Sequence, residues 1–142
     1  MQNTDRCKEA LEVLEEILNA VNEAASDSIL VVEGRRDVFS LRNLGISGDI
    51  RPCAYEPLAA FCENIAETGK GVIILTDWDR RGGILASSLS EQFKNLDVKC
   101  DLMFREKILF YSKREIKDVE SLYSYVGKLR QMFYPEIDDE TV

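Results

Sequence analysis

We predict an α/β fold from this sequence, with a mainly parallel four-stranded sheet covered by helices on both faces. Short apolar runs that suit strands alternate with longer stretches of helical periodicity, and this alternation is typical of α/β domains. The strand runs are almost continuously apolar, as in parallel strands that are buried on both faces. The chain has 142 residues and is 45% hydrophobic, which suits one domain with one core.

The first half of the chain contains three predicted helices and two predicted strands. Residues 5–24 have apolar side chains at three- and four-residue spacing and form the first helix. Residues 28–32 are a short β-branched run that forms a buried strand. A helix over residues 37–44 follows, and residues 50–53 form a short strand. Residues 56–68 form the third helix, which a glycine ends.

The second half begins with the clearest strand in the sequence, over residues 72–75. A helix over residues 83–96 follows it, and then a strand over residues 98–104. Residues 106–133 are predicted to be helical, with a break near residues 112–117. No linker divides the chain, so we expect a single folded unit.

Composition limits the chemistry that the chain can carry. It contains no histidine, which excludes Ser-His-Asp and Cys-His nucleophiles and leaves few ligands for zinc. The four cysteines are far apart, with no C-x-x-C pair, so we expect reduced thiols in a cytoplasmic protein. No apolar run could span a membrane, and the polar, acidic N-terminus is not a secretory signal. Any catalysis would use carboxylates, cations, hydroxyls or a hard metal ion.

The charge distribution is uneven along the chain. The net charge of −8 argues against a protein that coats nucleic acid non-specifically. Residues 1–27 carry seven acids and two cations, and the C-terminal EIDDETV is also acidic. Residues 28–52 carry four cations, all arginine, and three acids. The arginine-containing segments are therefore distinct from their acidic background.

Two apolar strands end in the same pattern, an acid followed by two arginines. SILVVEGRRD contains Glu33, and VIILTDWDRRGG contains Asp77 and Asp79. Because α/β proteins bind ligands at the carboxyl ends of parallel strands, we expect the three carboxylates to converge if the strands are neighbours. They would then repel one another, and a hard divalent cation would remove that cost. Magnesium, or manganese, suits this set because it takes one or two protein carboxylates and keeps other positions for water and phosphate.

An arginine pair follows each acidic strand end, where the next helix begins. Helix N-termini carry partial positive charge, so cations there are unfavourable unless an anion offsets them. A phosphate on the backbone amides and guanidinium groups would do so, and glycines would allow its close approach. The competing interpretation is structural ion pairs or solvated charges, such as a pair between Arg35 and Asp77. The predicted phosphate- or nucleic-acid-binding residues are Arg35, Arg36, Gly34, Arg80, Arg81 and Gly82.

With Glu33-Gly34 after one strand and Asp77-x-Asp79-x-x-Gly82 after another, the sequence resembles the Toprim domain of topoisomerases, DnaG-type primases and OLD-family nucleases. The resemblance covers residues 28–104, and VVEGRRDVFSLRNLGI and ILTDWDRRGGILA are closest to the small stand-alone Toprim proteins of archaea. It implies a compact Rossmann-like core over residues 28–104. Residues 1–27 would form an amphipathic helix packed on that core, and residues 105–142 a C-terminal helical extension with an acidic tail.

The resemblance implies a magnesium-dependent protein that acts on nucleic-acid phosphodiesters in RNA or DNA, as a nuclease or nucleotidyl-transfer enzyme. In such domains the acid matching Glu33 is the general acid or base and can touch the metal. The acids matching Asp77 and Asp79 hold magnesium. A RecR-like adaptor that binds nucleic acid without turnover is the alternative, although it has no chemical need for all three acids. The small, acidic chain also predicts a protein partner that supplies substrate affinity.

Two other families also place acids after an apolar strand. A haloacid-dehalogenase-type phosphatase requires Thr or Val where this chain has Arg81, and the 63 residues after Asp79 are too few for its later motifs. A receiver domain requires an acidic pair after its first strand, where this chain has the single acid Glu33. Both families fit the sequence less well than Toprim does.

The C-terminal part carries weaker signals. Lys117-Asp118-Val119-Glu120 would either add a carboxylate to the site or cap a helix. Trp78 should point away from the two aspartates and pack in the core. A cationic cluster, interleaved with aromatic residues, would either follow a nucleic-acid backbone while bases stack on the rings, or form the solvated face of a helix. Its members are Arg105, Lys107, Phe110, Tyr111, Lys113, Arg114 and Lys117.

Overall fold

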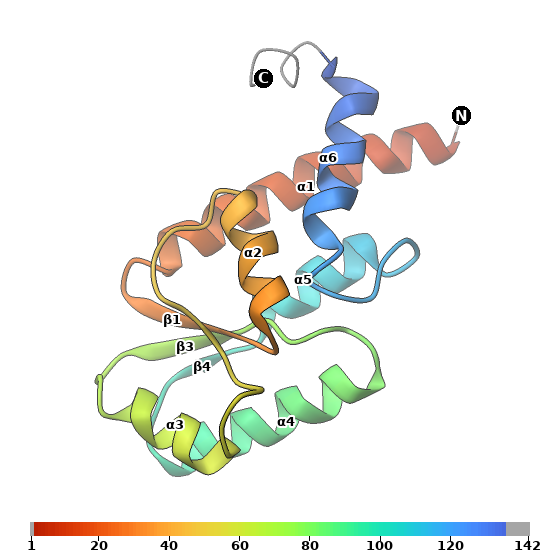
Figure 1. The fold of residues 1–142 in the computed structure, drawn as a ribbon. Coiled ribbons are helices and arrows are strands. Elements are labelled where there is room, and N and C mark those ends of the chain that lie inside the picture. Colours follow the sequence, from red (N-terminus) through yellow and green to blue (C-terminus); the bar gives the residue numbers. More distant parts are fainter. Residues whose placement is uncertain (1, 136–142) are drawn as a thin grey trace.

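A parallel four-stranded sheet lies between two layers of helices in the computed structural model, which describes residues 2–135 (Figure 1). The strand order is β2-β1-β3-β4, and each neighbouring pair is parallel. The predicted fold class is therefore confirmed. The strands are β1 (Ser28–Val32), β2 (Ile50–Pro52), β3 (Gly71–Ile74) and β4 (Cys100–Asp101).

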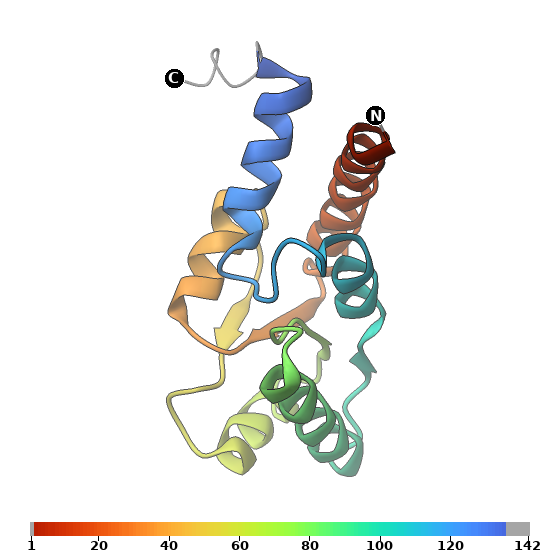
Figure 2. The ribbon, with the colours of Figure 1, turned by 90° about the vertical axis from the view of Figure 1, so that its right-hand side faces the viewer.

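Six helices of the described chain cover the two faces of the sheet unequally. Helices α3 and α4 lie on one face, and the other four lie on the opposite face (Figures 1 and 2). Among the described residues, no helix combines the length and apolar character needed to cross a membrane. The helices are α1 (Gln2–Ala24), α2 (Arg35–Asn43), α3 (Leu58–Ala66), α4 (Arg80–Asn95), α5 (Met103–Ser112) and α6 (Leu122–Phe133).

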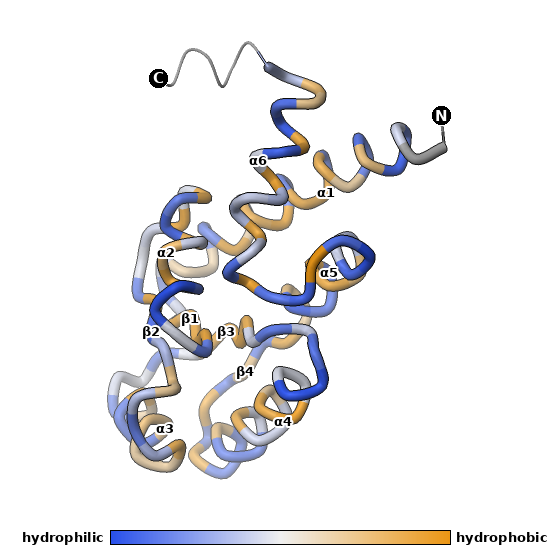
Figure 3. Tube along the Cα trace, turned by 45° about the vertical axis from the view of Figure 1, so that its right-hand side comes forward, coloured by the Kyte–Doolittle hydropathy of each residue, from blue (hydrophilic) through white to orange (hydrophobic). Residues whose placement is uncertain are grey.

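Alternate residues of the strands pack into two separate clusters, because successive side chains of a strand point to opposite faces. Ile29 and Val31 of β1 pack with α3 and α4, whereas Leu30 and Val32 pack with the four-helix layer. All four side chains are fully buried. In Figure 3, β1 and β3 run as hydrophobic segments through the middle of the molecule, while the helices alternate between hydrophilic and hydrophobic residues.

The last predicted strand is much shorter in the structure than in our prediction. We expected a strand over residues 98–104, but β4 is only Cys100–Asp101 and α5 already begins at Met103. The carboxylate of Asp101 accepts hydrogen bonds from the amides of Met103 at 2.8 Å and Phe104 at 3.3 Å. An acid that binds the amides two and three residues ahead favours a helix start over continued strand. The apolar sequence alone did not reveal this.

The helices that follow β1 and β3 both begin earlier than predicted, and this changes the position of the arginines in them. Helix α2 begins at Arg35 rather than at residue 37, and α4 begins at Arg80 rather than at residue 83. Each arginine pair therefore lies in the first turn of its helix. The break between the last two helices is also longer than predicted, since it covers residues 113–121.

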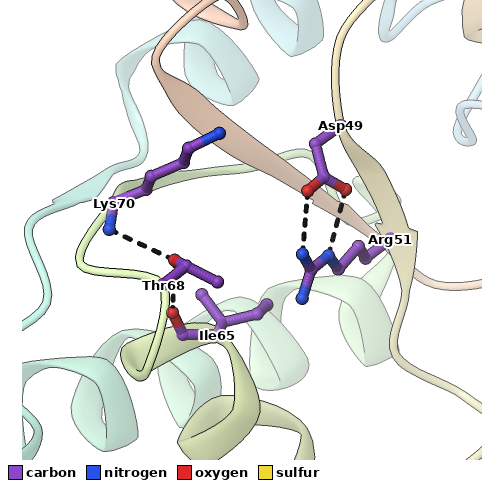
Figure 4. A network of polar contacts seen from close by, with 5 residues as sticks. All are labelled: Asp49, Arg51, Ile65, Thr68 and Lys70. Atoms are coloured by element: carbon purple, nitrogen blue, oxygen red, sulfur yellow. Dashed lines mark hydrogen bonds and ion pairs between the residues drawn. The ribbon is translucent and has the colours of Figure 1, made fainter.

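Near the amino-terminal ends of β2 and β3, polar contacts join residues that do not belong to the predicted site (Figure 4). Arg51 donates two hydrogen bonds to Asp49, at 3.0 and 2.8 Å. These bonds lower the pKa of the Asp49 carboxyl. Thr68 donates to the carbonyl of Ile65 at 2.6 Å and accepts from the amide of Lys70 at 3.2 Å. The charged groups at these amino-terminal ends bond to each other within the protein. The predicted site lies at the opposite, carboxyl-terminal ends of the strands.

Candidate functional site

The carboxyl ends of β1 and β3 bring two predicted site residues into contact. Val31 of β1 pairs with Ile74 of β3, so the residues that follow the two strands lie side by side. The amide of Asp77 donates a 2.8 Å hydrogen bond to Oε2 of Glu33, across 44 positions of sequence. The sequence predicted that these acids would converge if the strands were neighbours, and the strands are neighbours.

Asp79 has a different local role from the other two acids. It is the N-cap of α4, and its Oδ1 accepts a 2.7 Å hydrogen bond from the amide of Gly82. Within residues 2–135, no three acidic or cysteine side chains lie together as a ready-made metal site. The structure therefore joins Glu33 and Asp77 directly and leaves Asp79 at the start of the helix.

Asp77 is a half-buried acid that lies beside two other acids, and its pKa is raised. The pKa of its carboxyl is raised to about 7, mainly by burial and in addition by the negative charges of Glu33 and Asp37. The protonated group can also donate to the Glu33 carboxylate, whereas a 2.9 Å hydrogen bond from the amide of Val119 to Oδ1 opposes the shift. Near neutral pH this cluster therefore favours either a proton on Asp77 or a bound cation.

Asp37 is a buried acid of this cluster for which the sequence predicts only the start of a helix. Its Oδ2 accepts a 2.9 Å hydrogen bond from the amide of Gly34, at the N-terminus of α2. Burial raises the pKa of Asp37, and the charges of Glu33 and Glu120 add to the effect. Its position three residues after Gly34 matches the reciprocal half of a capping box, which is the signal that sequence reasoning could have used.

Arg105 is a second residue that the sequence did not assign to the site. Its Nε donates to the carbonyl of Thr76 at 3.0 Å, and its Nη2 donates to the carbonyl of Asp77 at 2.6 Å. Burial lowers the pKa of Arg105, and the charges of Glu33 and Asp77 oppose that shift. The sequence places Arg105 in a cluster that would follow nucleic acid or face solvent, but in the structure it holds the end of β3. Nothing in its local sequence distinguishes it from the neighbouring cations.

The glycine in the second strand-end motif is required by packing within the protein. A Cβ atom on Gly82 would lie 1.8 Å from the carbonyl oxygen of Asp77, and Gly82 is buried. The hydroxyl of Thr76 also donates to the carbonyl of Gly82 at 2.8 Å. We predicted that Gly82 would let a phosphate approach the backbone, but the close approach there is made by Asp77. Gly34, the matching residue of the first motif, has its amide bonded to Asp37.

The arginine pair of α2 contacts other parts of the chain. Arg35 lies over the ring of Tyr55, with its guanidinium carbon 4.4 Å from the ring centroid, and its amide donates to the Tyr55 hydroxyl at 3.1 Å. Arg36 forms an exposed ion pair of 3.3 Å with Glu120. Among the ion pairs of the described residues, none joins Arg35 to Asp77, a pair that the sequence allowed.

The arginine pair of α4 faces outward. Arg80 and Arg81 are both exposed in the first turn of the helix. Arg81 and Glu33 line the same shallow hollow of about 290 Å³ beside the strand ends. An anion that entered this hollow would therefore meet a cation and the predicted proton-transfer residue together.

Residues 116–119 close one side of the site. Trp78 donates from its amide to the carbonyl of Lys117 at 2.9 Å, and from Nε1 to the carbonyl of Ile116 at 2.8 Å. Its half-buried ring packs against the core, as predicted. Of the two roles considered for the acids nearby, Asp118 caps the following turn by accepting from the amide of Ser121 at 2.8 Å.

Comparisons with known proteins place the chain among archaeal relatives. No family model matches the sequence. A UPF0292 protein of Methanosarcina acetivorans is 44% identical over 141 residues, which cover 99% of this chain and 98% of the relative. A UPF0292 protein of Methanocaldococcus jannaschii is 37% identical over 87% of this chain and 97% of the relative.

One solved structure, of a protein from Aquifex aeolicus, has the same fold. It superposes with a TM-score of 0.66 at 21% identity, over 75% of this chain and 95% of that protein. At that identity the likeness concerns the fold alone. The two archaeal relatives match almost their whole lengths at well above 30% identity, and the chain belongs to the UPF0292 family.

Proposed function

We propose that this chain is a magnesium-dependent protein of the Toprim type that acts on nucleic-acid phosphodiesters, as a nuclease or nucleotidyl-transfer enzyme. The observation that carries the proposal is the contact between Glu33 and Asp77 at the carboxyl edge of the sheet. Two acids from neighbouring strands meet there, and Arg81 lines the adjoining hollow. This is the edge at which α/β proteins bind their ligands.

The donor set fits a hard cation. Asp77 and Asp79 would hold the ion, and one or two carboxylates suffice because magnesium keeps waters and substrate oxygens in its other positions. The raised pKa of Asp77 supports this assignment, since its charge is not fully compensated by the surrounding protein. When bound, magnesium would stabilise the charge that develops on the phosphate.

The residues of the chain would share the remaining tasks. We assign proton transfer to Glu33, which the Asp77 amide orients through Oε2. Arg80 and Arg81, at the exposed start of α4, would bind a substrate phosphate. Arg105 would fix the position of the Asp77 backbone, to which it already donates.

One observation favours the alternative, a nucleic-acid-binding adaptor without turnover. Each of the three acids accepts a hydrogen bond from a backbone amide: Glu33 from Asp77, Asp77 from Val119, and Asp79 from Gly82. Each acid therefore has a structural use that needs no catalysis. The raised pKa of Asp77 weighs against this alternative, because an amide in place of that carboxyl would keep the bond to Val119 without the electrostatic cost.

Labelled single- and double-stranded RNA and DNA, incubated with magnesium or manganese and with EDTA, test the proposal. We expect cleavage or nucleotide transfer that requires the metal. Glu33→Gln can still accept from the Asp77 amide and should lose roughly 10²- to 10⁴-fold in rate, the usual worth of a general acid or base. Glu91→Gln, an exposed position of α4, is the matched control. Binding without any metal-dependent reaction would favour the adaptor, and full activity of Glu33→Gln would exclude the assigned role.

A further inference from the structure

A second cavity lies outside the acidic site, between the N-terminal half of α1, the end of α5 and the beginning of α6. Its volume is about 540 Å³. Six of its eleven lining residues are aromatic or cationic, in a chain with a net charge of −8. The six that matter for its chemistry are Arg6, Phe110, Tyr111, Lys113, Arg114 and Tyr125.

One aromatic ring that lines the cavity, that of Phe110, is exposed rather than packed in the core. Phe110 is 59% exposed, although it is a large apolar side chain on a helix. Its ring centroid lies 5.0 Å from that of Tyr111, which packs partly against the core and supports it. The ammonium group of Lys113 lies 5.7 Å from the Phe110 centroid. An exposed ring beside a second, tilted ring, with a cation over it, is suited to interact with a flat group that carries negative charge nearby.

The charges around the cavity favour an anionic ligand. Arg6, Lys113 and Arg114 line it and are exposed, and they outnumber the two acids of the lining, Glu9 and Glu115. None of the three cations belongs to an ion pair among the described residues. Their charges are therefore available to phosphates.

The cavity is tied to the acidic site by a short piece of chain. Glu115 lines the cavity, and two residues later Lys117 accepts the amide hydrogen bond of Trp78, between the two site aspartates. Two residues of extended chain span at most about 7 Å. In both Figure 1 and Figure 2, the segment between α5 and α6 passes next to the turn between β3 and α4.

We propose that this cavity binds an unpaired base and the adjoining phosphates of a single-stranded nucleic acid. The inference rests on the proposed function, because it makes the cavity a subsite for the strand that reaches Glu33 and Asp77. Only an unstacked base can enter a cavity and lie against Phe110, so a continuous duplex cannot use it. Arg6, Lys113 and Arg114 would hold the phosphates on either side of that base.

Fluorescence anisotropy with short labelled oligonucleotides in EDTA tests the subsite without any metal chemistry. We expect single-stranded RNA or DNA to bind more tightly than a duplex of the same sequence. Phe110→Ala should weaken single-strand binding about tenfold, the effect of losing one stacked base. Lys113→Gln/Arg114→Gln should weaken it and reduce the slope of log affinity against log salt by about 1.4, the value for two lost phosphate contacts.

Two matched variants control for exposure and charge elsewhere on the surface. Phe39→Ala removes an aromatic ring that is 69% exposed on α2, and Lys94→Gln/Lys99→Gln removes two exposed cations from the α4 side. Neither should change the affinity. A strand substituted with 5-iodouracil should cross-link to the peptide that contains Phe110 and Tyr111, and mass spectrometry would identify that peptide.

The outcomes separate this inference from the proposed function. Single-strand binding that depends on Phe110 supports the subsite even if no metal-dependent reaction is found. Metal-dependent cleavage that Phe110→Ala and Lys113→Gln/Arg114→Gln leave unchanged would support the function and overturn the subsite. Equal affinity for single strand and duplex would also overturn it, as would tighter binding of an acidic peptide than of the oligonucleotide.

Discussion

The carboxylate of Asp77 accepts a 2.9 Å hydrogen bond from the amide of Val119, a residue 42 positions further along the chain. Val119 lies outside residues 28–104, the range that the sequence predicts to be the core of the fold. The C-terminal region therefore takes part in holding the acidic turn, through Val119, Lys117 and Ile116. The properties of the site should depend on this region as well as on the strand ends.

Replacement of Asp77 by Asn should stabilise the protein in a pH-dependent way. The Asp77 pKa is about 7 in the folded protein, against an ordinary value of 3.8, so the folded state holds a proton that the unfolded chain releases between these values. The stability of the wild type should therefore fall as the pH rises from about 4 to about 7. Asn can still accept from Val119 but does not titrate. We expect the variant to match the wild type near pH 4 and to exceed it by about 1–2 kcal/mol at pH 8, with allowance for solvent screening. Urea unfolding across this range measures the difference, and a difference that does not change with pH would contradict the assignment.

Replacement of Asp79 by Asn should separate metal binding from folding. Asn is as good an N-cap as Asp, so α4 should keep its first turn and the free energy of unfolding should change by less than about 0.5 kcal/mol. The charge available to a cation is lost, however. Calorimetry with manganese should detect weak binding by the wild type, because most of the coordination shell awaits substrate, and none by the double variant Asp77→Asn/Asp79→Asn. Equal manganese binding by the wild type and the double variant would show that the metal binds at another site.

Replacement of Arg105 by Ala should loosen the end of β3. Two hydrogen bonds from a charged donor are lost, and the carbonyls of Thr76 and Asp77 lose their partner, so we expect a loss of about 2–4 kcal/mol in the free energy of unfolding. Arg105→Lys should recover only part, since an ammonium group cannot reproduce the planar fork. Arg114→Ala, an exposed cation nine positions away in the sequence, should change stability by less than about 0.5 kcal/mol. Similar stability of Arg105→Ala and Arg114→Ala in urea would show that the Arg105 bonds contribute little.

The two adjacent glycines of α4 should respond in opposite directions to the same change. Gly82→Ala would place a Cβ atom 1.8 Å from the carbonyl oxygen of Asp77, and we expect a loss of at least about 3 kcal/mol or failure to fold. At Gly83 the nearest atom to a Cβ would be an Arg105 nitrogen at 4.0 Å, so Ala should gain up to about 1 kcal/mol from helix propensity. Thermal unfolding of the two variants checks this. Equal behaviour would mean that the turn can open to accommodate the methyl group.

Removal of both exposed arginines of α4 should weaken oligonucleotide binding and leave the fold intact. For Arg80→Ala/Arg81→Ala we expect the salt slope of binding to single strands to fall by about 1.4, as two phosphate contacts disappear. Stability should not decrease, because cations leave the positive end of a helix. Binding and urea unfolding should be measured on the same preparations. Unchanged binding with lower stability would identify the two arginines as structural.

Much of this arrangement follows from local sequence. The continuous apolar character of residues 28–32 and 72–75 predicts buried parallel strands, since both faces of such strands are covered. The acids directly after them then fall at the carboxyl edge of the sheet. The arginine pairs begin helices because strands in such a sheet need crossover helices. These features depend on the spacing and periodicity of residues, which can be read directly from the sequence.

The tertiary structure decided which residues meet. The pairing of β1 with β3 brings Glu33 to the Asp77 amide, and the sequence allowed this without requiring it. The bonds from Arg105 and Val119 to the same turn join positions 28 and 42 residues apart. Such contacts follow from how α5 and residues 113–121 fold back over the sheet, and no local pattern encodes them. The sequence by itself therefore determined the order of the strands and helices and the acids at the strand ends, although not the bounds of β4, because the order and the acids depend on short-range periodicity. Only the tertiary structure decided the partners of those acids and the raised pKa of Asp77, because burial and charge proximity depend on the packing of the whole chain.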